Sequence, residues 1–449
     1  MTEVDGVNSS APAFLKFLYV ISISAAGMGE WKVITNTLGG LPKAITLGAI
    51  ALAVLYCIVT TDTRNLKRVI KPYLMYVLLI GMILLWSFVI WILSFTSVNS
   101  VIRGSEKMIY QMISITAAAS AVVLFGFESI DLFCISMCIS NSLIILFEML
   151  RFGIGSSIKS FVHNIVTFGD AVGFARNLEI HEMTFQFGML LIYYALFAPV
   201  RYKEEKKKNR IFLCLCIFFF IAGLKRIAVV ALLITLLIGY ISKKSKNPGK
   251  LMTAFGVIIF LGLFLYIKLV RDGIMSIIMT KVGINMMGRD YIWALTKEFY
   301  SFSPAFMGLG FEAVDAIAKG WYESGLLNRA YNFHNDVLKV FVELGFSGFT
   351  LWAGIQYIIY PIFFTKKYSP KVTLLYMTIL IYMTFTYMTD NTAFYFWCTM
   401  CLRLLPMAYI FTLPEEEKKE KWKPMQKDEY RHAVEDNYLK RLNEGRQGF

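Results

Sequence analysis

His334 is the side chain in this sequence best placed to act as a base. It precedes an apolar run that predicts a helix from about residue 337, and Asn335 or Asp336 is a natural N-cap for that helix. The positive end of the helix dipole favours a neutral imidazole, which can accept a proton. His334 is therefore a candidate general base. The alternative is a capping or interfacial histidine, which is the better interpretation for a single isolated histidine.

Basic side chains at two other places could bind an anion. Lys225 and Arg226 separate two short apolar runs, and a charge at membrane depth, which costs roughly 2.5–3.5 kcal/mol, marks a functional site by default. Arg289 follows Gly288 in the first turn of a predicted helix, where a cation opposes the helix dipole unless an anion is bound there. The alternatives are a snorkelling pair at a helix end and a surface arginine paired with Asp290.

Twelve apolar segments must position these side chains. A helix needs about 20 apolar residues to cross the hydrocarbon core. The predicted spans are 14–29, 42–60, 73–95, 108–125, 131–150, 183–199, 211–223, 226–241, 251–270, 337–364, 372–388 and 392–412. Spans seven and eight are short and predict a broken hairpin around Gly223–Arg226, with a re-entrant pair as the alternative. The expected fold is an all-α polytopic membrane protein with about 12 transmembrane helices and a large external loop between spans nine and ten.

The basic residues predict the orientation of this array. They cluster between spans two and three, six and seven, eight and nine, and ten and eleven, and cytoplasmic loops carry such an excess. Twelve spans with both termini in the cytoplasm place all four clusters inside. Lys225, Arg226, Arg289 and His334 then lie together at the outer face.

Three longer segments are predicted outside, and they are 96–107, 151–182 and 271–336. The last is expected to be an external catalytic loop within a membrane domain of residues 1–413, and it contains an amphipathic helix that begins near Arg289. Segment 151–182 could line an acceptor site, although a solvated loop is the preferred interpretation. Residues 414–449 are expected to form a charged cytoplasmic tail.

The composition excludes a soluble protein. Of the 449 residues, 57% are hydrophobic and only 17% are charged, more apolar surface than a soluble chain could bury. The net charge of +14 is explained by cytoplasmic loops, so nucleic acid is not an expected partner.

The cysteines lie in apolar runs and are interpreted as packing thiols, including the CxxC pair Cys398 and Cys401. No cleavable signal is evident, because Met1–Ala13 carries two acids and no base.

Several short motifs follow one another in the C-terminal half of the chain. They are Arg226 in the broken hairpin, Gly288-Arg289 followed by Trp293, Ser303-Pro304, Gly308-Leu309-Gly310, and His334-Asn335 followed by Leu338, Glu343 and Gly345. In this order, and with the predicted topology, they resemble the O-antigen polymerase and O-antigen ligase superfamily over residues 211–365. One departure is Lys225, which stands where a Ser or Thr usually precedes the hairpin arginine.

The resemblance implies an enzyme that transfers an oligosaccharide from an undecaprenyl-diphosphate lipid to an acceptor hydroxyl. The transfer takes place at the outer face of the cytoplasmic (inner) membrane. Arg289 and Arg226 would stabilise the charge that develops on the diphosphate, and His334 would take the acceptor proton in a single, inverting displacement. The residues expected to bind substrate are Lys225, Asn335, Glu343 and Tyr291, with a structural role for Glu343 an equal alternative. No metal and no cofactor is implied, because cations of the protein take up the leaving-group charge.

The favoured function is a polymerase that joins lipid-linked repeat units into a surface polysaccharide, such as O-antigen, capsule or exopolysaccharide. A chain-length regulator is then an expected partner. A composition rich in Lys and Ile, with 11 Pro, suggests an organism without lipid A, which disfavours a ligase that moves the finished glycan to a lipid A core or a protein. A polysaccharide flippase or other transporter would hold its broken helices near the midplane, often in two related halves, and no repeat is visible. A peptidoglycan-type glycosyltransferase would rely on a loop Asp instead of His334.

Overall fold

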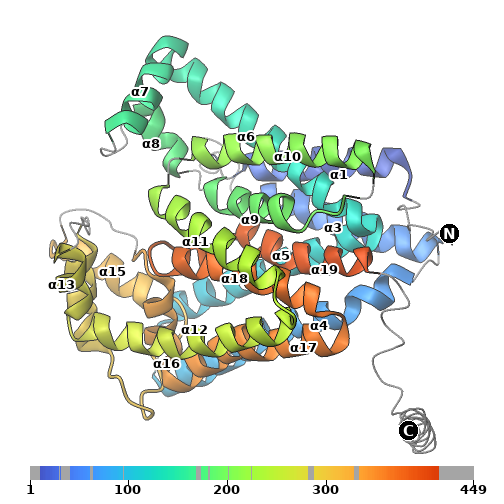
Figure 1. Cartoon of the computed structure of the whole chain (residues 1–449). Helices are drawn as coiled ribbons and strands as arrows, with labels where there is room; N and C mark the ends of the chain where they lie inside the picture. The colour runs from blue at the N-terminus through green and yellow to red at the C-terminus, as the bar shows by residue number, and fades with distance from the viewer. Residues whose placement is uncertain are drawn as a thin grey trace, which may run out of the picture. The chain divides into compact units, whose positions relative to one another are not determined.

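The computed structural model describes residues 11–29, 31, 41–60, 64–94, 96–167, 173–180, 183–200, 202–223, 225–281, 288–327 and 333–413. Within these ranges all regular secondary structure is helical, which confirms the predicted all-α class (Figure 1). The predicted cytoplasmic tail, 414–449, lies outside the described residues.

Each predicted span falls on a described helix, and further helices lie between the spans. Their bounds are α1 (Ala13–Met28), α3 (Leu41–Thr60), α4 (Arg64–Leu93), α5 (Val98–Phe125), α6 (Ser129–Phe152), α7 (Ile154–Thr167), α8 (Gly173–Ile180), α9 (Met183–Leu196), α10 (Lys203–Ala222), α11 (Arg226–Lys243), α12 (Pro248–Arg271), α13 (Ile274–Lys281), α14 (Arg289–Thr296), α15 (Ala313–Glu323), α16 (Asp336–Gly354), α17 (Tyr360–Lys367), α18 (Pro370–Tyr387) and α19 (Phe396–Tyr409). A π-helical turn, Ile355–Ile359, joins α16 to α17. In chain order, the predicted spans fall on α1, α3, α4, α5, α6, α9, α10, α11, α12, α16 with α17, α18 and α19.

Six described segments are long and apolar enough to cross a membrane. They are Leu41–Thr60, Asn65–Leu93, Val98–Phe152, Arg226–Lys243, Pro248–Arg271 and Asp336–Lys367, and the third of these contains both α5 and α6. Shorter apolar helices cover Ala13–Met28, Thr184–Leu196 and Phe396–Thr412. The chain is therefore a multi-pass membrane protein, while the count of twelve crossings and their orientation stay predictions.

Several helices extend beyond the apolar runs that predicted them. Residues 96–107 were predicted to lie outside, and most of this segment belongs to α5, which already begins at Val98. The Ser97 hydroxyl caps it by accepting a hydrogen bond from the Ser100 N–H at 3.4 Å. α4 and α10 likewise begin in their basic segments, since Lys, Arg and Glu are good helix formers although they do not suit the hydrocarbon core.

The two other external segments also contain helices. Segment 151–182 carries α7 and α8, which pack on each other and against α6 (Figure 1). The predicted amphipathic helix near Arg289 is present as α14, and a 3-10 turn, Lys297–Phe299, follows it. Much of the predicted external loop is thus folded into short helices.

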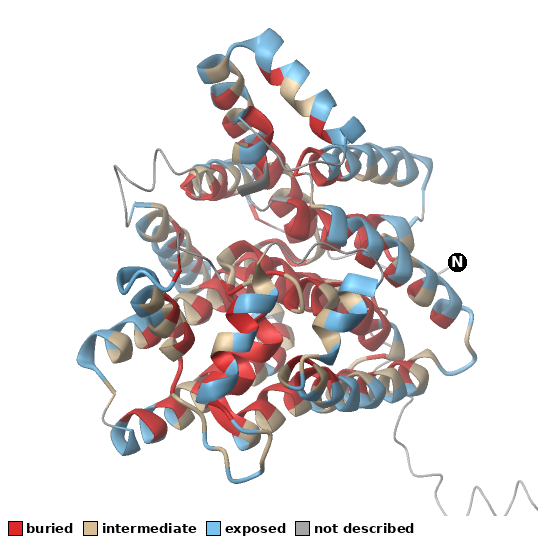
Figure 2. Ribbon diagram, turned by 90° about the vertical axis from the view of Figure 1, so that its left-hand side faces the viewer, coloured by how far each residue is buried: buried red, intermediate tan, exposed pale blue. Residues whose placement is uncertain are grey.

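The core of the described chain is built on α18 and the first half of α16. From Val372 to Tyr387 every side chain of α18 except Phe385 is buried, and α18 packs against α9, α11, α12, α17 and α19 (Figure 2). A helix that is apolar on all sides is expected to be surrounded by others. By contrast, α3 leaves Leu55, Ile58 and Val59 between 56% and 72% exposed, as a lipid-facing helix does.

Candidate active site

His334 and Lys225 meet at Asp390, a residue in the short loop between α18 and α19. The Nδ1 atom of His334 lies 3.0 Å from Asp390 Oδ1, and Lys225 Nζ donates a hydrogen bond to Asp390 Oδ2 at 3.2 Å. The Asp390 side chain is 5% exposed, whereas the imidazole is 28% exposed. The carboxylate is therefore enclosed between two partners, and the imidazole still reaches the surface.

The backbone around His334 fixes where its imidazole lies. The Asn335 side chain caps α16 by accepting a hydrogen bond from the Leu338 N–H at 3.0 Å, as predicted. Asn335 also donates to the Tyr266 hydroxyl at 2.8 Å, and that hydroxyl donates to the Met388 carbonyl at 3.1 Å. Phe333 and Asn335 are both buried, and His334 adopts a φ of 47°, in the left-handed region that favours glycine. This local strain turns the imidazole out of the core towards Asp390.

Asp390 determines which imidazole nitrogen can act as a base. An ionised carboxylate only accepts hydrogen bonds, so the Nδ1 atom of a neutral His334 must carry the proton and Nε2 is left as the proton acceptor. Burial alone would raise the pKa of Asp390, but the charge of Lys225, the hydrogen bond from His334 and the Asn391 N–H together hold it below its usual range. Asp390 therefore stays ionised while it orients the imidazole.

The surroundings of Lys225 differ from those expected of a residue that contacts phosphate. It is the N-cap residue of α11, its side chain is 14% exposed, and Nζ lies 5.7 Å from the centre of the Phe185 ring on α9. One of its partners is a carboxylate of the protein, that of Asp390. Lysine has three N–H donors, so the bond to Asp390 leaves it able to donate to a further acceptor.

Arg289 approaches the same place from the external segment. It is the first residue of α14, and Trp293 on that helix donates a hydrogen bond to the Phe333 carbonyl at 3.5 Å. The Arg289 guanidinium also interacts electrostatically with the Tyr266 hydroxyl, the group that binds Asn335. The helix that carries Arg289 is therefore attached to Phe333, the residue before His334.

The remaining predicted site residues lie apart from this constellation. Arg226 is exposed at the first position of α11, next to Lys225, and Tyr291 is 49% exposed on α14. Glu343 is fully buried about two turns along α16, where its carboxylate accepts a hydrogen bond from the Val314 N–H at 3.2 Å. This position favours the structural alternative for Glu343.

A second charged cluster, absent from the sequence-based prediction, surrounds Glu343. Lys339 Nζ lies 3.2 Å from Glu312 Oε1, 2.5 Å from Asp315 Oδ2 and 3.9 Å from Glu343 Oε1. Lys107 on α5 also contacts Glu312, at 2.5 Å. These ion pairs attach α5 and α15 to the helix that follows His334.

The glycine motifs join the external segment to a break in α16. Gly345 has φ 68° and ψ −173°, so the helix is interrupted there. The Leu309 N–H donates to the Val342 carbonyl at 3.1 Å, and the Gly310 N–H donates to the Glu343 carbonyl at 2.8 Å. A Cβ on Gly345 would lie 2.2 Å from the Met307 carbonyl carbon, so only glycine permits this approach.

Comparison with known families agrees with this arrangement. Residues 211–353, about a third of the chain, match the family described as O-antigen ligase, which confirms the predicted resemblance. This family comprises polytopic membrane proteins with an O-antigen ligase or polysaccharide polymerase kind of activity, so the match implies a glycan-transferring enzyme with lipid-linked glycan substrates. No curated protein matches the chain. The matched region contains Lys225, Arg289 and His334, whereas Asp390 lies beyond it.

Proposed function

We propose that this protein polymerises polyprenyl-diphosphate-linked oligosaccharide repeat units into a surface polysaccharide at the outer face of the cytoplasmic membrane. The observation that supports this most is the hydrogen bond between His334 and Asp390, which gives an exposed imidazole an oriented, basic Nε2. His334 lies within the region that matches a glycan-transferring family, and Asp390 lies beyond the end of that region.

In the proposed reaction, the acceptor hydroxyl gives its proton to Nε2 of His334 as its oxygen attacks the anomeric carbon of the donor. The bond between that carbon and the diphosphate oxygen breaks, and the anomeric configuration inverts. Asp390 stabilises the imidazolium that forms, without taking the proton itself. The polyprenyl diphosphate leaves as an anion, so no acid is needed to protonate it.

The charge on the leaving diphosphate requires cations fixed in place before the reaction. Arg289 is the first candidate, because a guanidinium remains charged and donates two parallel hydrogen bonds to phosphate oxygens. Arg226 is the second, since its exposed position next to Lys225 leaves it accessible to a lipid headgroup. Lys225 is assigned to holding Asp390, with a phosphate contact as a further role.

The direct test uses the purified full chain in lipid nanodiscs with a polyprenyl-diphosphate oligosaccharide. We expect polyprenyl diphosphate to be released and longer lipid-linked glycans to appear, and His334→Ala to abolish both. Transfer of one finished glycan to a lipid A core or a protein, without longer lipid-linked products, would instead identify a ligase. If His334→Ala and Arg289→Ala both keep normal turnover, the assigned residues are wrong.

Deletion in the host separates the two activities independently. Loss of a polymerase should leave single repeat units on the acceptor, whereas loss of a ligase should leave polymer on the carrier lipid. The size distribution of the surface glycan distinguishes these outcomes.

A further inference from the structure

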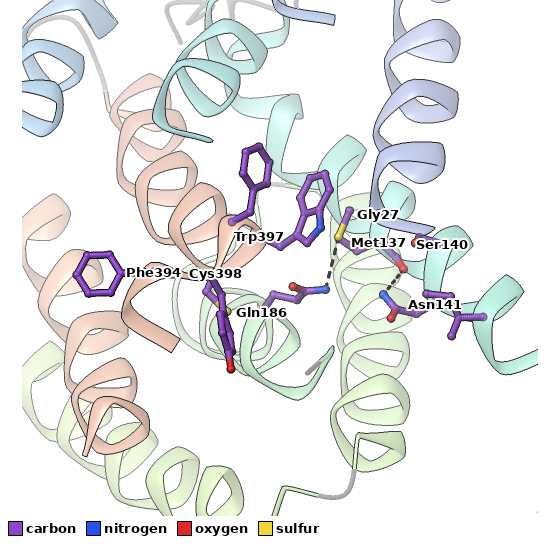
Figure 3. A pocket seen from close by; sticks show the side chains of 11 residues that line it. Gly27, Met137, Ser140, Asn141, Gln186, Phe394, Trp397 and Cys398 are labelled. Atoms are coloured by element: carbon purple, nitrogen blue, oxygen red, sulfur yellow. Dashed lines mark hydrogen bonds between the residues drawn. The ribbon is translucent and has the colours of Figure 1, made fainter. Parts of the chain in front are cut away.

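A cavity of about 180 Å³ lies between the end of α1, the middle of α6 and the first turns of α9 and α19 (Figure 3). Its lining residues are Gly27, Met137, Ser140, Asn141, Ile144, Gln186 and the run from Phe394 to Cys398. None of these lining residues, all in the described part of the chain, carries a charged side chain. The cavity therefore suits a neutral ligand better than a diphosphate.

Two polar groups in the cavity wall have no hydrogen-bond partner in the described structure. They are the Ser140 hydroxyl and the Trp397 indole N–H, on side chains that are 1% and 6% exposed. Figure 3 draws both among the side chains that line the cavity, together with the amides of Asn141 and Gln186. A buried donor without a partner costs about 1–3 kcal/mol, so these groups are expected to meet a polar ligand when the site is filled.

The size of the cavity limits what it can hold. An apolar cavity of ~150 Å³ accommodates one benzene ring, so this cavity has room for a single six-membered ring. Its wall combines aromatic side chains with hydroxyl and amide groups, as small-molecule sites with a few orienting polar groups do. A pyranose ring, with apolar faces and hydroxyls at its edge, matches that lining.

Two segments that line the cavity are connected along the chain to residues around the His334–Asp390 pair. Gln186 follows Phe185, whose ring lies 5.7 Å from Lys225 Nζ, and Lys225 contacts Asp390. Phe394 lies in the same α18–α19 loop as Asp390, four residues further along the chain. Arg289 comes from another side, because its helix packs on α12. The cavity and the proposed diphosphate site are thus built from different helices.

We propose that this cavity is a subsite for one sugar ring of the lipid-linked glycan, held beside the reacting hydroxyl. Ser140 and Trp397 donate hydrogen bonds to its ring substituents, and Asn141 and Gln186 add amide contacts. The proposal rests on the proposed transferase function, because that function supplies the glycan. The ring belongs either to the donor or to the acceptor, and the two have the same chemistry.

Ser140→Ala and Trp397→Phe test the subsite. Each removes one donor that the empty protein leaves without a partner. Ser140→Ala should therefore leave the thermal unfolding temperature without substrate unchanged or higher, whereas Trp397→Phe also removes buried ring volume and should lower it. Ser136→Ala, one turn earlier on α6, is the matched control, since its hydroxyl already donates to the Leu132 carbonyl at 2.8 Å and lies outside the cavity lining. Each cavity variant should raise the KM for lipid-linked glycan about two- to tenfold, as loss of one hydrogen bond does, with kcat little changed.

Measuring the KM for the donor and for the acceptor separately shows which substrate supplies the sugar ring. A raised KM for the donor alone or for the acceptor alone supports the subsite and names its occupant. Unchanged KM values for both in Ser140→Ala and Trp397→Phe overturn the proposal. A lower unfolding temperature of Ser140→Ala with unchanged KM indicates that the cavity holds structural water only. This outcome also overturns the proposal.

A binding measurement keeps the test independent of turnover. Methyl glycosides of glucose, galactose and N-acetylglucosamine serve as probes for saturation-transfer NMR with His334→Ala protein in nanodiscs. Binding that Ser140→Leu abolishes by filling the cavity supports the subsite even if the wild-type protein releases no polyprenyl diphosphate. The absence of polyprenyl diphosphate release would refute the proposed function but not the subsite. If turnover is absent and no probe binds, the subsite is refuted as well.

Discussion

Asp390 lies 3.0 Å from His334 Nδ1 although 56 residues separate the two in the chain. The pair joins the loop between α18 and α19 to the residue before the α16 N-cap. Asp390 is a positioning residue in the proposed mechanism, because it acts on the imidazole and not on the glycan.

Asp390→Asn should therefore remove activity while the fold is kept. The amide can donate to Nδ1 and so favours the tautomer in which Nε2 carries the proton and cannot act as a base. We expect the release of polyprenyl diphosphate to fall by about 10²–10⁴-fold, the usual contribution of general base catalysis. Substrate binding by His334→Ala and Asp390→Asn should be similar. Activity of Asp390→Asn within a few-fold of wild type would exclude the proposed role.

Lys225→Met should lower stability in a pH-dependent way. Lys225 is the largest influence that holds the pKa of Asp390 below its usual range, and a depressed carboxyl pKa stabilises the fold above the unfolded pKa and loses that effect as the pH falls through the folded pKa. Loss of this charged hydrogen bond should cost about 1.5–3 kcal/mol at neutral pH. The unfolding temperatures of wild type and Lys225→Met should therefore converge in strong acid. A constant difference across the pH range would contradict this account.

Arg289→Lys separates charge from geometry at the proposed diphosphate site. Lysine retains the positive charge but loses the planar pair of donors, so we expect kcat to fall by about tenfold or more for loss of one good bidentate contact. Arg226→Lys, on the second candidate arginine, is the parallel measurement. If both lysine variants turn over like wild type, neither arginine makes a bidentate contact to the phosphate.

Gly345→Ala should destabilise the protein, whereas Gly354→Ala on the same helix should not. An added Cβ on Gly345 would overlap the Met307 carbonyl carbon at 2.2 Å and would sit at a positive φ of 68°. At Gly354 the nearest atom to such a Cβ is Phe260 Cε2, at 3.8 Å, an ordinary contact. We expect the first change to cost more than about 2 kcal/mol and the second to be neutral or to stabilise by about 0.5–1 kcal/mol. Thermal unfolding of the two purified variants measures the difference.

Lys339→Met tests the buried cluster around Glu343. Removing this cation leaves Glu312, Asp315 and Glu343 near one another with only Lys107 as a counter-charge, which should cost about 3–5 kcal/mol. Lys319→Met is the control, because Lys319 makes an exposed pair with Glu323 one turn away on α15. Equal unfolding temperatures for the two variants would show that the cluster does not hold the fold together.

The sequence predicted the parts of the site that depend on local order. Apolar runs located the helices, and the polar residues before residue 337 located the Asn335 cap and therefore His334. Asp390 was missed because its role depends on a contact between distant segments. The available signal was a single acid between spans eleven and twelve, on the same predicted outer face as His334. The ends of α4, α5 and α10 were missed because hydropathy marks the limits of the hydrocarbon core and not the limits of a helix.

The break in α16 also could not be predicted from its own sequence. Gly345 alone is compatible with a continuous helix, and the interruption depends on the approach of Met307 and Gly308 from the external segment. Similarly, Lys225 was expected to contact phosphate because its charge was visible in the sequence and its partner Asp390 was not recognised.

The connection between residues 309–310 and residues 342–343 is made by backbone atoms alone. These hydrogen bonds set no requirement on the side chain of Leu309, whereas Val342 is fully buried and must stay apolar. Mutation can therefore replace much of this segment over evolutionary time, provided that Gly308 and Gly345 remain, and the histidine keeps its support. Substitutions in this segment would then change the surface it presents while the backbone support of the α16 break is kept.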